Sequence, residues 1–205
     1  MILSFDTATD VATACIRADG EVLAESATPG RSVGAQRLLD DVHGLLDHAG
    51  MPLEAVDVIV AGTGPGTFTG LRIGLATAHG LGFALGIPVR GVSTLDALLV
   101  PAGVDVACID ARRGEVFCAG AGIEPQAMTP AAMAAALPAG TVVVGDGAVR
   151  YRDQLTGVDV PADDSPLHVP HARQHAALYA VAGPPEPLYL RDPDADRALA
   201  AKAPA

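Results

Sequence analysis

The sequence predicts an α/β fold in which one unit of strands and helices occurs twice. Short apolar runs, typical of buried strands, alternate with segments whose apolar residues recur at helical spacing. The order starts again after residue 100: Asp105–Ile109 runs into Asp110 as Ile2–Phe5 runs into Asp6, and each aspartate precedes a short turn and a second strand. This duplicated ββ(β)αβα unit favours an actin-like ATPase (ASKHA, ribonuclease-H-like) fold.

The first half carries the signals of the whole unit. A turn at Asp19-Gly20 predicts a hairpin, Gly50 and Pro52 end the first helix, and Ser93 is a predicted N-cap. The predicted strands are residues 1–6, Val11–Ile16, Glu21–Ala27, Ala55–Ala61 and Ile87–Val92. The predicted helices are Val33–Ala49, a segment that follows the turn Gly62–Gly70 and ends near Leu85, and Leu95–Leu99.

The second half has weaker signals, and we expect a degenerate copy. Its predicted strands are Asp105–Ile109, Glu115–Ala119 and Thr141–Val144, and its predicted helices are Pro130–Leu137, Ala148–Leu155 and Ala172–Ala182. Prolines and acids between residues 156 and 170 predict an irregular linker. We therefore divide the chain into an N-terminal subdomain at 1–100, a smaller C-terminal subdomain at 101–191 and a loose tail at 192–205.

Composition excludes several classes of function. The 205 residues include 13 basic and 24 acidic ones, which argues against independent binding to nucleic acid. The only lysine is Lys202, so the chain has no P-loop lysine. Three isolated cysteines predict a reducing, cytoplasmic location, and no apolar stretch resembles a membrane span.

The helix after the glycine-rich turn Gly62–Gly70 is the most informative element. The turn itself could hold an anion, but a tight strand-to-helix corner is the favoured interpretation. Small residues recur every fourth position from Gly70 through Gly74, Ala78 and Gly82. Interior glycines cost about 1 kcal/mol each relative to alanine, so we expect a close neighbour along this row to offset the cost. The neighbour is either another part of this chain or, as we favour, a helix of a partner chain.

Asp6 and Asp110 end strands where an actin-like fold places its phosphate loops. The loop after Asp6, including Thr7, has no glycine. In the second loop Arg112 and Arg113 could hold phosphate, although surface ion pairs are an equally good interpretation. We therefore expect vestigial nucleotide loops, to which the turn containing Gly145 and Gly147 also belongs, and no catalytic residue.

A histidine run, His168, His171 and His175, has a spacing that can bind a metal. It has no intervening acid of the H-E-x-x-H kind, and we favour a solvated helix face. Whether the histidines bind a metal stays open, and we predict no metal site and no cofactor bound by this chain.

The block Gly64-Pro-Gly-Thr-Phe-Thr-Gly-Leu-Arg-Ile-Gly74 closely resembles the TsaB (YeaZ) family. Weaker matches follow in the family's order up to residue 191: Ile2–Thr7, Gly91–Ala97, Asp110–Val116, Gly145–Ala148 and Pro187–Arg191. One departure lies at Gly34-Ala35-Gln36, where relatives often carry His-Ser-Glu or His-Ala-Glu. This removes a further possible metal ligand.

The resemblance implies a role in forming N6-threonylcarbamoyladenosine (t6A) at position 37 of tRNAs that read ANN codons. It implies a non-catalytic subunit that binds a TsaD-like transferase as a heterodimer, forms a homodimer when alone and contacts tRNA only indirectly. A TsaE-like ATPase joins the assembly, and the partners carry ATP and metal. The expected interface lies on the helices Val33–Ala49 and Gly70–Leu85. Its expected residues are Leu38, Leu39, Val42, Gly70, Leu71, Ile73, Gly74, Ala78 and Gly82.

Three other functions remain to be distinguished from this one. An active ATPase or kinase of the same fold would need working phosphate loops, and a glycoprotease-like metalloenzyme would need histidine ligands. A homodimeric binding module would use the same apolar helix face for a second copy of itself.

Overall fold

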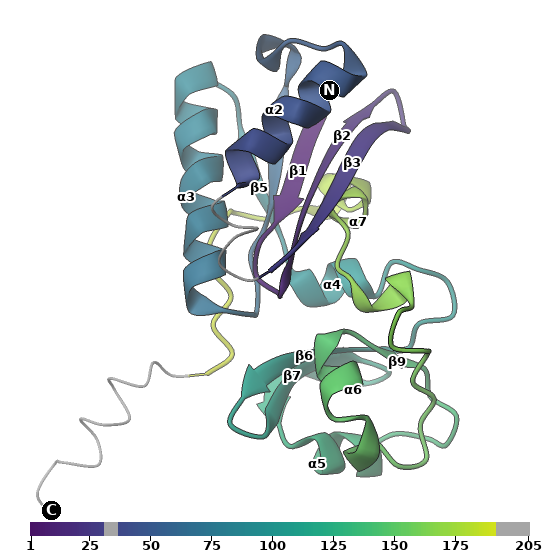
Figure 1. Ribbon diagram of the computed structural model, residues 1–205. Helices are drawn as coiled ribbons and strands as arrows, with labels where there is room; N and C mark the ends of the chain where they lie inside the picture. The colour runs from purple at the N-terminus through teal and green to yellow at the C-terminus, as the bar shows by residue number, and fades with distance from the viewer. Residues whose placement is uncertain (31–36, 192–205) are drawn as a thin grey trace, which may run out of the picture.

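Two mixed sheets of the same topology form the framework of the molecule (Figure 1). The computed structural model describes residues 1–30 and 37–191. The first sheet has the order β3-β2-β1-β4-β5 and the second β8-β7-β6-β9. In each sheet the opening strand, β1 or β6, pairs antiparallel with the next strand and parallel with the strand after the first helix. The duplicated actin-like fold is therefore confirmed.

Most predicted elements are present with shifted ends. The strands are β1 Ile2–Asp6, β2 Val11–Ala18, β3 Glu21–Pro29, β4 Val58–Gly62, β5 Val89–Val92, β6 Val106–Arg112, β7 Glu115–Gly120, β8 Ile123–Met128 and β9 Val143–Val144. The α-helices are α2 Leu38–Ala49, α3 Phe68–Leu85, α4 Thr94–Leu98, α5 Pro130–Ala135, α6 Asp146–Arg150 and α7 Ala172–Ala177. Short 3-10 helices lie at η1 Leu53–Ala55, η2 Arg152–Gln154, η3 Pro166–His168 and η4 Tyr179–Val181. The predicted start of the first helix, residues 33–36, lies outside the described residues, as does the tail at 192–205.

The second sheet is degenerate at one edge and complete at the other. In the described part of the chain, the position next to β9 is taken by the segment around Asp159, which makes one parallel bridge to Val142 in place of a fifth strand. At the opposite edge, β8 was not predicted, because Pro125 and a polar, exposed sequence conceal it. The turn Ala121-Gly122, with φ angles of 46° and 83°, is the signal that could have revealed it.

Helices cover both faces of the first sheet. The amphipathic α2 and the long α3 pack on one face, around a core that includes Leu3, Phe5 and Ile59, and α7 packs on the other (Figure 1). In the second sheet, α5 and α6 cover one face. The other face packs against α4, whose Leu95 and Leu98 are fully buried, so α4 joins the two halves.

The C-terminal part of the chain returns to the first half, which corrects the predicted boundaries. Instead of staying in a subdomain at 101–191, α7 packs against β1 and β2. The segment after it runs along the edge of the first sheet, where Gly183 pairs with Gly91 and the Leu188 N–H donates to the Thr63 carbonyl at 2.8 Å. It then reaches the second half, where Arg191 Nη1 donates to the Ala111 carbonyl at 2.9 Å. This strap, residues 183–191, ties the two halves together.

Among the described residues, we find no helix that is both long enough and apolar enough to cross a membrane.

Candidate functional site

Asp6, at the end of β1, is enclosed by groups of this chain. Its side chain is 1% exposed, and its Oδ1 accepts the Ala8 N–H at 2.6 Å. Its Oδ2 accepts the Thr94 hydroxyl at 2.6 Å and lies 2.9 Å from Nε2 of the fully buried His175. Burial raises the pKa of the Asp6 carboxyl, but these partners, His175 above all, outweigh burial and hold the pKa below its usual value. Both oxygens are thus occupied by internal contacts.

The loop after Asp6 is locked against the start of α3. The Thr7 hydroxyl donates to the Gly70 carbonyl at 2.7 Å, and the Thr67 N–H donates to the Ala8 carbonyl at 2.7 Å. A Cβ on Gly66 would overlap the backbone of Ala8, so glycine is required for this approach. These contacts support the tight strand-to-helix corner over an anion-binding turn.

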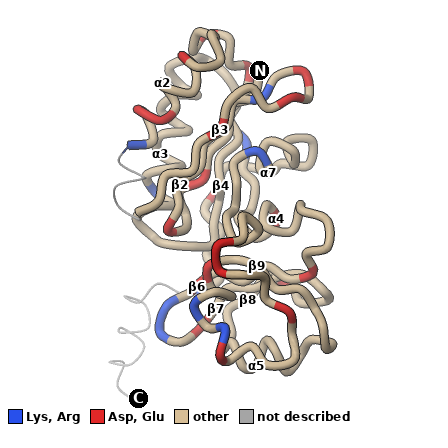
Figure 2. The backbone as a smooth tube through the Cα atoms, turned by 45° about the vertical axis from the view of Figure 1, so that its right-hand side comes forward, with Lys and Arg blue, Asp and Glu red and all other residues tan. Residues whose placement is uncertain are grey.

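Asp110, at the corresponding place in the second half, is also engaged. Its Oδ1 accepts the Tyr151 hydroxyl at 3.0 Å and the Arg112 N–H at 2.8 Å. Its Oδ2 forms an ion pair at 2.7 Å with Nη1 of Arg112, and Arg112 also lies 3.7 Å from Asp10 of the first half. The ion-pair interpretation of Arg112 therefore holds. Arg113 and Gly114 form the tip of this hairpin in left-handed conformations, in the basic segment that Figure 2 shows between β6 and β7.

The turn at Gly145 and Gly147 approaches β6 closely. A Cβ on Gly145 would overlap the Cys108 carbonyl, and one on Gly147 would lie 2.8 Å from the Ile109 carbonyl carbon. The Gly145 N–H donates to Nδ1 of His168 at 3.1 Å. In this structure the turn is used for packing between α6 and β6.

Asp146 lies between these two glycines, and its Oδ1 accepts the backbone N–H of Asp110 at 2.9 Å. Burial raises the pKa of Asp146 to about 6, and the nearby charges of Asp10 and Asp110 act in the same direction. Asp146 and Tyr151 were not among the predicted site residues, because only the fold brings them to Asp110.

Asp146→Asn is expected to stabilise the protein above pH 7. An aspartate whose folded pKa is raised stabilises the fold fully below its unfolded pKa, and this contribution is lost as pH rises from about 4 through 6. Two pKa units correspond to about 3 kcal/mol, and asparagine can still accept the Asp110 N–H. Urea unfolding of both proteins from pH 4 to 8 should show a difference that grows with pH. A constant difference would contradict the assignment.

Two of the three histidines are buried and His171 is half-buried, which corrects the interpretation of the run as a solvated face. His168 is 6% exposed and His175 is fully buried. His168 binds the Gly145 N–H and the carbonyls of 161 and 162, and His171 is the N-cap residue of α7. The three side chains thus make separate contacts, and no group of three or more His, Cys, Asp or Glu side chains that could hold a metal ion occurs in the described ranges.

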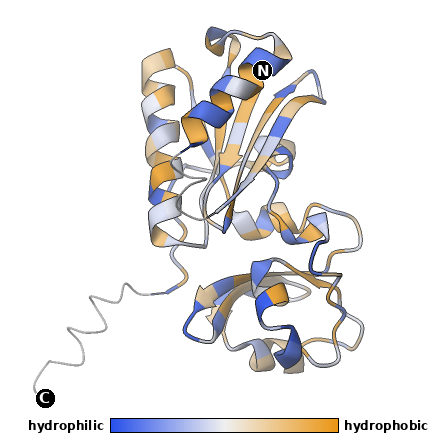
Figure 3. Cartoon of the chain, viewed as in Figure 1, coloured by the Kyte–Doolittle hydropathy of each residue, from blue (hydrophilic) through white to orange (hydrophobic). Residues whose placement is uncertain are grey.

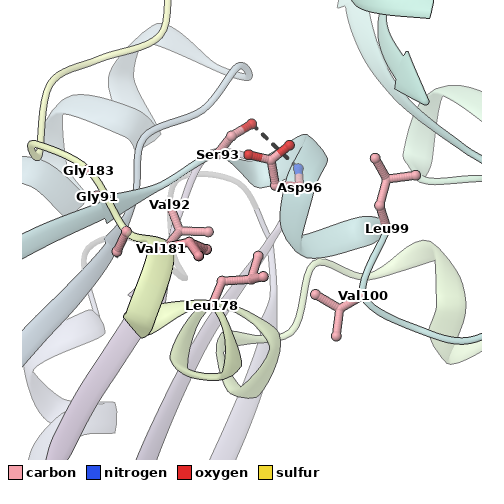
Figure 4. A pocket seen from close by; sticks show the side chains of 10 residues that line it. Gly91, Val92, Ser93, Asp96, Leu99, Val100, Leu178, Val181 and Gly183 are labelled. Carbon is pink, nitrogen blue, oxygen red and sulfur yellow. Dashed lines mark hydrogen bonds between the residues drawn. The ribbon is translucent and has the colours of Figure 1, made fainter. Parts of the chain in front are cut away.

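Two hollows in the surface of the molecule could hold a small ligand. One, of about 400 Å³, lies between the halves and is lined by Thr67, Phe68, Asp110, Arg112 and Arg191 among others. The other, of about 410 Å³, lies between α4 and η4 (Figure 4). It is lined mainly by apolar residues and by Asp96, whose pKa burial raises. None of the predicted site residues lines the second hollow.

The small-residue row of α3 faces this chain, so its prediction as a partner surface is wrong. Gly70, Gly74, Ala78 and Gly82 are all buried. A Cβ on Gly70 would overlap the Thr7 carbonyl, one on Gly74 the Thr7 hydroxyl, and one on Gly82 the side chain of Val89. The close neighbour along the row is the first sheet and its loops.

The expected interface therefore divides into inner and outer residues. Leu38, Val42 and Leu71 lie in the core with the glycine row, Ile73 is half-buried, and Leu39 is 56% exposed. The outer face of α3 carries a second small row, Ala76, Gly80 and Ala84, all exposed. Beside it, Phe83 is 91% exposed. Figure 3 shows apolar residues along α3 up to its end.

Comparisons with known proteins agree with this architecture. The profile of the family TsaD, tRNA N6-adenosine threonylcarbamoyltransferase, matches residues 34–141. The chain thus belongs to the actin-like group of TsaD-related proteins. Two solved Pseudomonas aeruginosa proteins match over nearly their whole length. YeaZ has a TM-score of 0.76 and 29% identity, covering 92% of this chain and 99% of its own. A protein described as similar to peptidase YeaZ has a TM-score of 0.75 and 30% identity, covering 93% and 99%.

Proteins of similar sequence show which branch of the TsaD-related proteins this chain belongs to. The tRNA threonylcarbamoyladenosine biosynthesis protein TsaB of Escherichia coli is 39% identical over 124 residues, which are 58% of this chain and 53% of TsaB. An uncharacterised protein of Mycobacterium tuberculosis is 39% identical over 199 residues, covering 95% of this chain and 93% of its own. This chain belongs to the TsaB (YeaZ) family.

Proposed function

We propose that this chain is a non-catalytic subunit in the formation of t6A at position 37 of tRNAs that read ANN codons. In this role it binds and activates a TsaD-type transferase, which carries the metal and transfers the threonylcarbamoyl group, while a TsaE-type ATPase joins the assembly. The membership in the TsaB family and the name of the E. coli relative support the pathway. ATP and metal are then bound by the partners, and tRNA is contacted only through the complex.

The main support for a non-catalytic role is that the carboxylates of Asp6 and Asp110 are engaged in contacts within the chain. A working phosphate loop needs a carboxylate free to hold a metal and flexible glycine-rich backbone beside it. Here both oxygens of Asp6 and of Asp110 are engaged by side chains and N–H groups of the same chain. Hydrolysis of ATP by the pure protein would contradict this proposal and favour the kinase-like alternative. Stoichiometric zinc or iron after purification would favour the metalloenzyme.

The outer face of α3 is the proposed surface for the transferase. Its exposed row of Ala76, Gly80 and Ala84 allows a partner helix to approach closely, and Phe83 offers an aromatic side chain to bury. Leu39 adds an exposed apolar side chain from α2, which packs on the same side of the sheet (Figure 1). When the protein is alone, a second copy covers the same face.

Phe83→Glu is expected to weaken binding of the cognate TsaD-type transferase by about thirtyfold or more, the effect of losing a central aromatic contact. The side chain is 91% exposed, so the folded state should be unchanged. Val181→Glu is the matched control, because Val181 is 78% exposed but lies on η4. Binding is measured by titration calorimetry, and t6A by nucleoside analysis of tRNA from cells with each variant. Normal binding and t6A with Phe83→Glu would exclude this face.

A further inference from the structure

Two cysteines lie directly opposite each other in the second sheet. Cys108 on β6 is the register partner of Cys118 on β7. Both side chains belong to the same core cluster, beneath α5 and α6, and both are fully buried free thiols. The third cysteine, Cys15 on β2, is equally buried, but its register partner on β1 is Ser4.

The direction of the backbone hydrogen bonds of β6 determines the Cα–Cα distance between Cys108 and Cys118. The Val106 N–H donates to Val142 at 3.1 Å and the Asp110 N–H donates to Asp146 at 2.9 Å, so both point away from β7. The backbone N–H and C=O groups of alternate residues in a strand point to the same side. Those of Cys108, which lies between Val106 and Asp110 in this alternation, therefore also point away from β7. The close approach of Gly145 to the Cys108 carbonyl agrees.

Cys108 and Cys118 are therefore a non-hydrogen-bonded antiparallel pair. The Cα atoms of such a pair are about 4.5 Å apart, with the side chains on one face. Disulfides span Cα distances of about 4.4 to 6.8 Å, so a bond between these sulfurs requires no change of register.

We propose that Cys108 and Cys118 form a redox-sensitive dithiol that closes to an intramolecular disulfide when the protein meets a peroxide. In the first step one thiolate sulfur attacks a peroxide oxygen, the O–O bond breaks, and a sulfenic acid forms as hydroxide leaves; the proton released when the thiol ionised converts this hydroxide to water. In the second step the other sulfur attacks the sulfenic sulfur, and the S–O bond breaks with release of a second water. Two thiols are oxidised, and one hydrogen peroxide is reduced to two waters.

Burial makes this reaction slow rather than impossible. It raises the pKa of Cys118 to about 11, and it also raises the pKa of Cys108 well above its usual value. The acidic groups of Asp146 and Asp110 disfavour a thiolate at Cys108 as well, so Cys118 is the better source of the attacking thiolate. The covering helix α5 has only six residues, and its local opening admits a small neutral oxidant without unfolding of the whole chain. Burial raises the pKa of Cys15 to about 11 as well, which makes Cys15 an internal control that lacks a resolving partner.

The test is oxidation of the full chain in native buffer with hydrogen peroxide, removal of the peroxide with catalase, and alkylation after denaturation. The proposal expects a mass lower by two hydrogens, one alkylated cysteine, Cys15, and a crosslinked peptide pair that contains Cys108 and Cys118. Cys15→Ser should give the same crosslink. Cys108→Ser should give none, and its Cys118 should instead be trapped by a sulfenic acid reagent.

Three alkylated cysteines after oxidation would overturn the proposal, as would crosslinks to Cys15 or between chains. The melting temperature separates a native bond from one formed in unfolded chain. The crosslinked protein should melt several degrees higher than the reduced one and return to the original value after reduction. A lower melting temperature would show that the strands must shift, which also contradicts the proposal.

Discussion

Gly70→Ala is expected to destabilise the protein by about 3 kcal/mol, whereas Gly80→Ala, ten residues along the same helix, should stabilise it by about 1 kcal/mol. A methyl group on Gly70 would overlap the Thr7 carbonyl, a backbone atom that cannot move aside. At Gly80 the same methyl meets nothing within 4 Å, and only the gain in helix propensity remains. Urea unfolding of the two variants measures both effects.

This pair of variants tests which side of α3 faces the sheet. Equal effects of the two substitutions would contradict the buried row. Loss of transferase binding by Gly70→Ala, with unchanged stability, would restore the prediction that the buried row is the partner surface.

His175→Ala is expected to cost about 4 kcal/mol, because it leaves the Asp6 carboxylate buried and without its main partner. Asp6→Ala should cost a similar amount. The double variant should cost clearly less than the sum, since the two side chains form one interaction. Because the folded pKa of Asp6 is below its usual value, the contribution of the Asp6 carboxylate is present above about pH 4 and is lost as pH falls below it.

The control for this cycle is His48→Ala, since His48 is exposed at the end of α2. Its effect should stay within about 0.5 kcal/mol. If Asp6→Ala left stability unchanged but removed a measurable ATPase activity, Asp6 would be a catalytic residue and the non-catalytic proposal would fail.

The local signals of the sequence predicted the fold well where each strand or helix is stabilised by its own pattern. The hairpin turn at Asp19-Gly20 adopts the two left-handed φ angles expected of it, 51° and 88°, and the Ser93 hydroxyl accepts the Leu95 N–H at 3.2 Å as the predicted N-cap. The edge strand β8 was missed because it buries few side chains and so lacks an apolar pattern.

The candidate site was predicted in part. Asp6 and Asp110 were found because each follows a short apolar run typical of a buried strand, and the ion pair of Arg112 was an open alternative. His175 could not be assigned to Asp6, because 168 residues separate the two and helical spacing linked it to His171 instead. The prediction that the glycine row of α3 faces a partner chain was wrong for a similar reason. Small residues show that a neighbour is close, but not whether it belongs to the same chain.

The return of the last part of the chain to the first sheet has a consequence for synthesis on the ribosome. The first hundred residues emerge without the His175 partner of Asp6 and with one sheet face uncovered, because α7 is translated only after the second sheet. The nascent N-terminal half is therefore an incomplete folding unit, and the native state is reached only after the strap has left the exit tunnel.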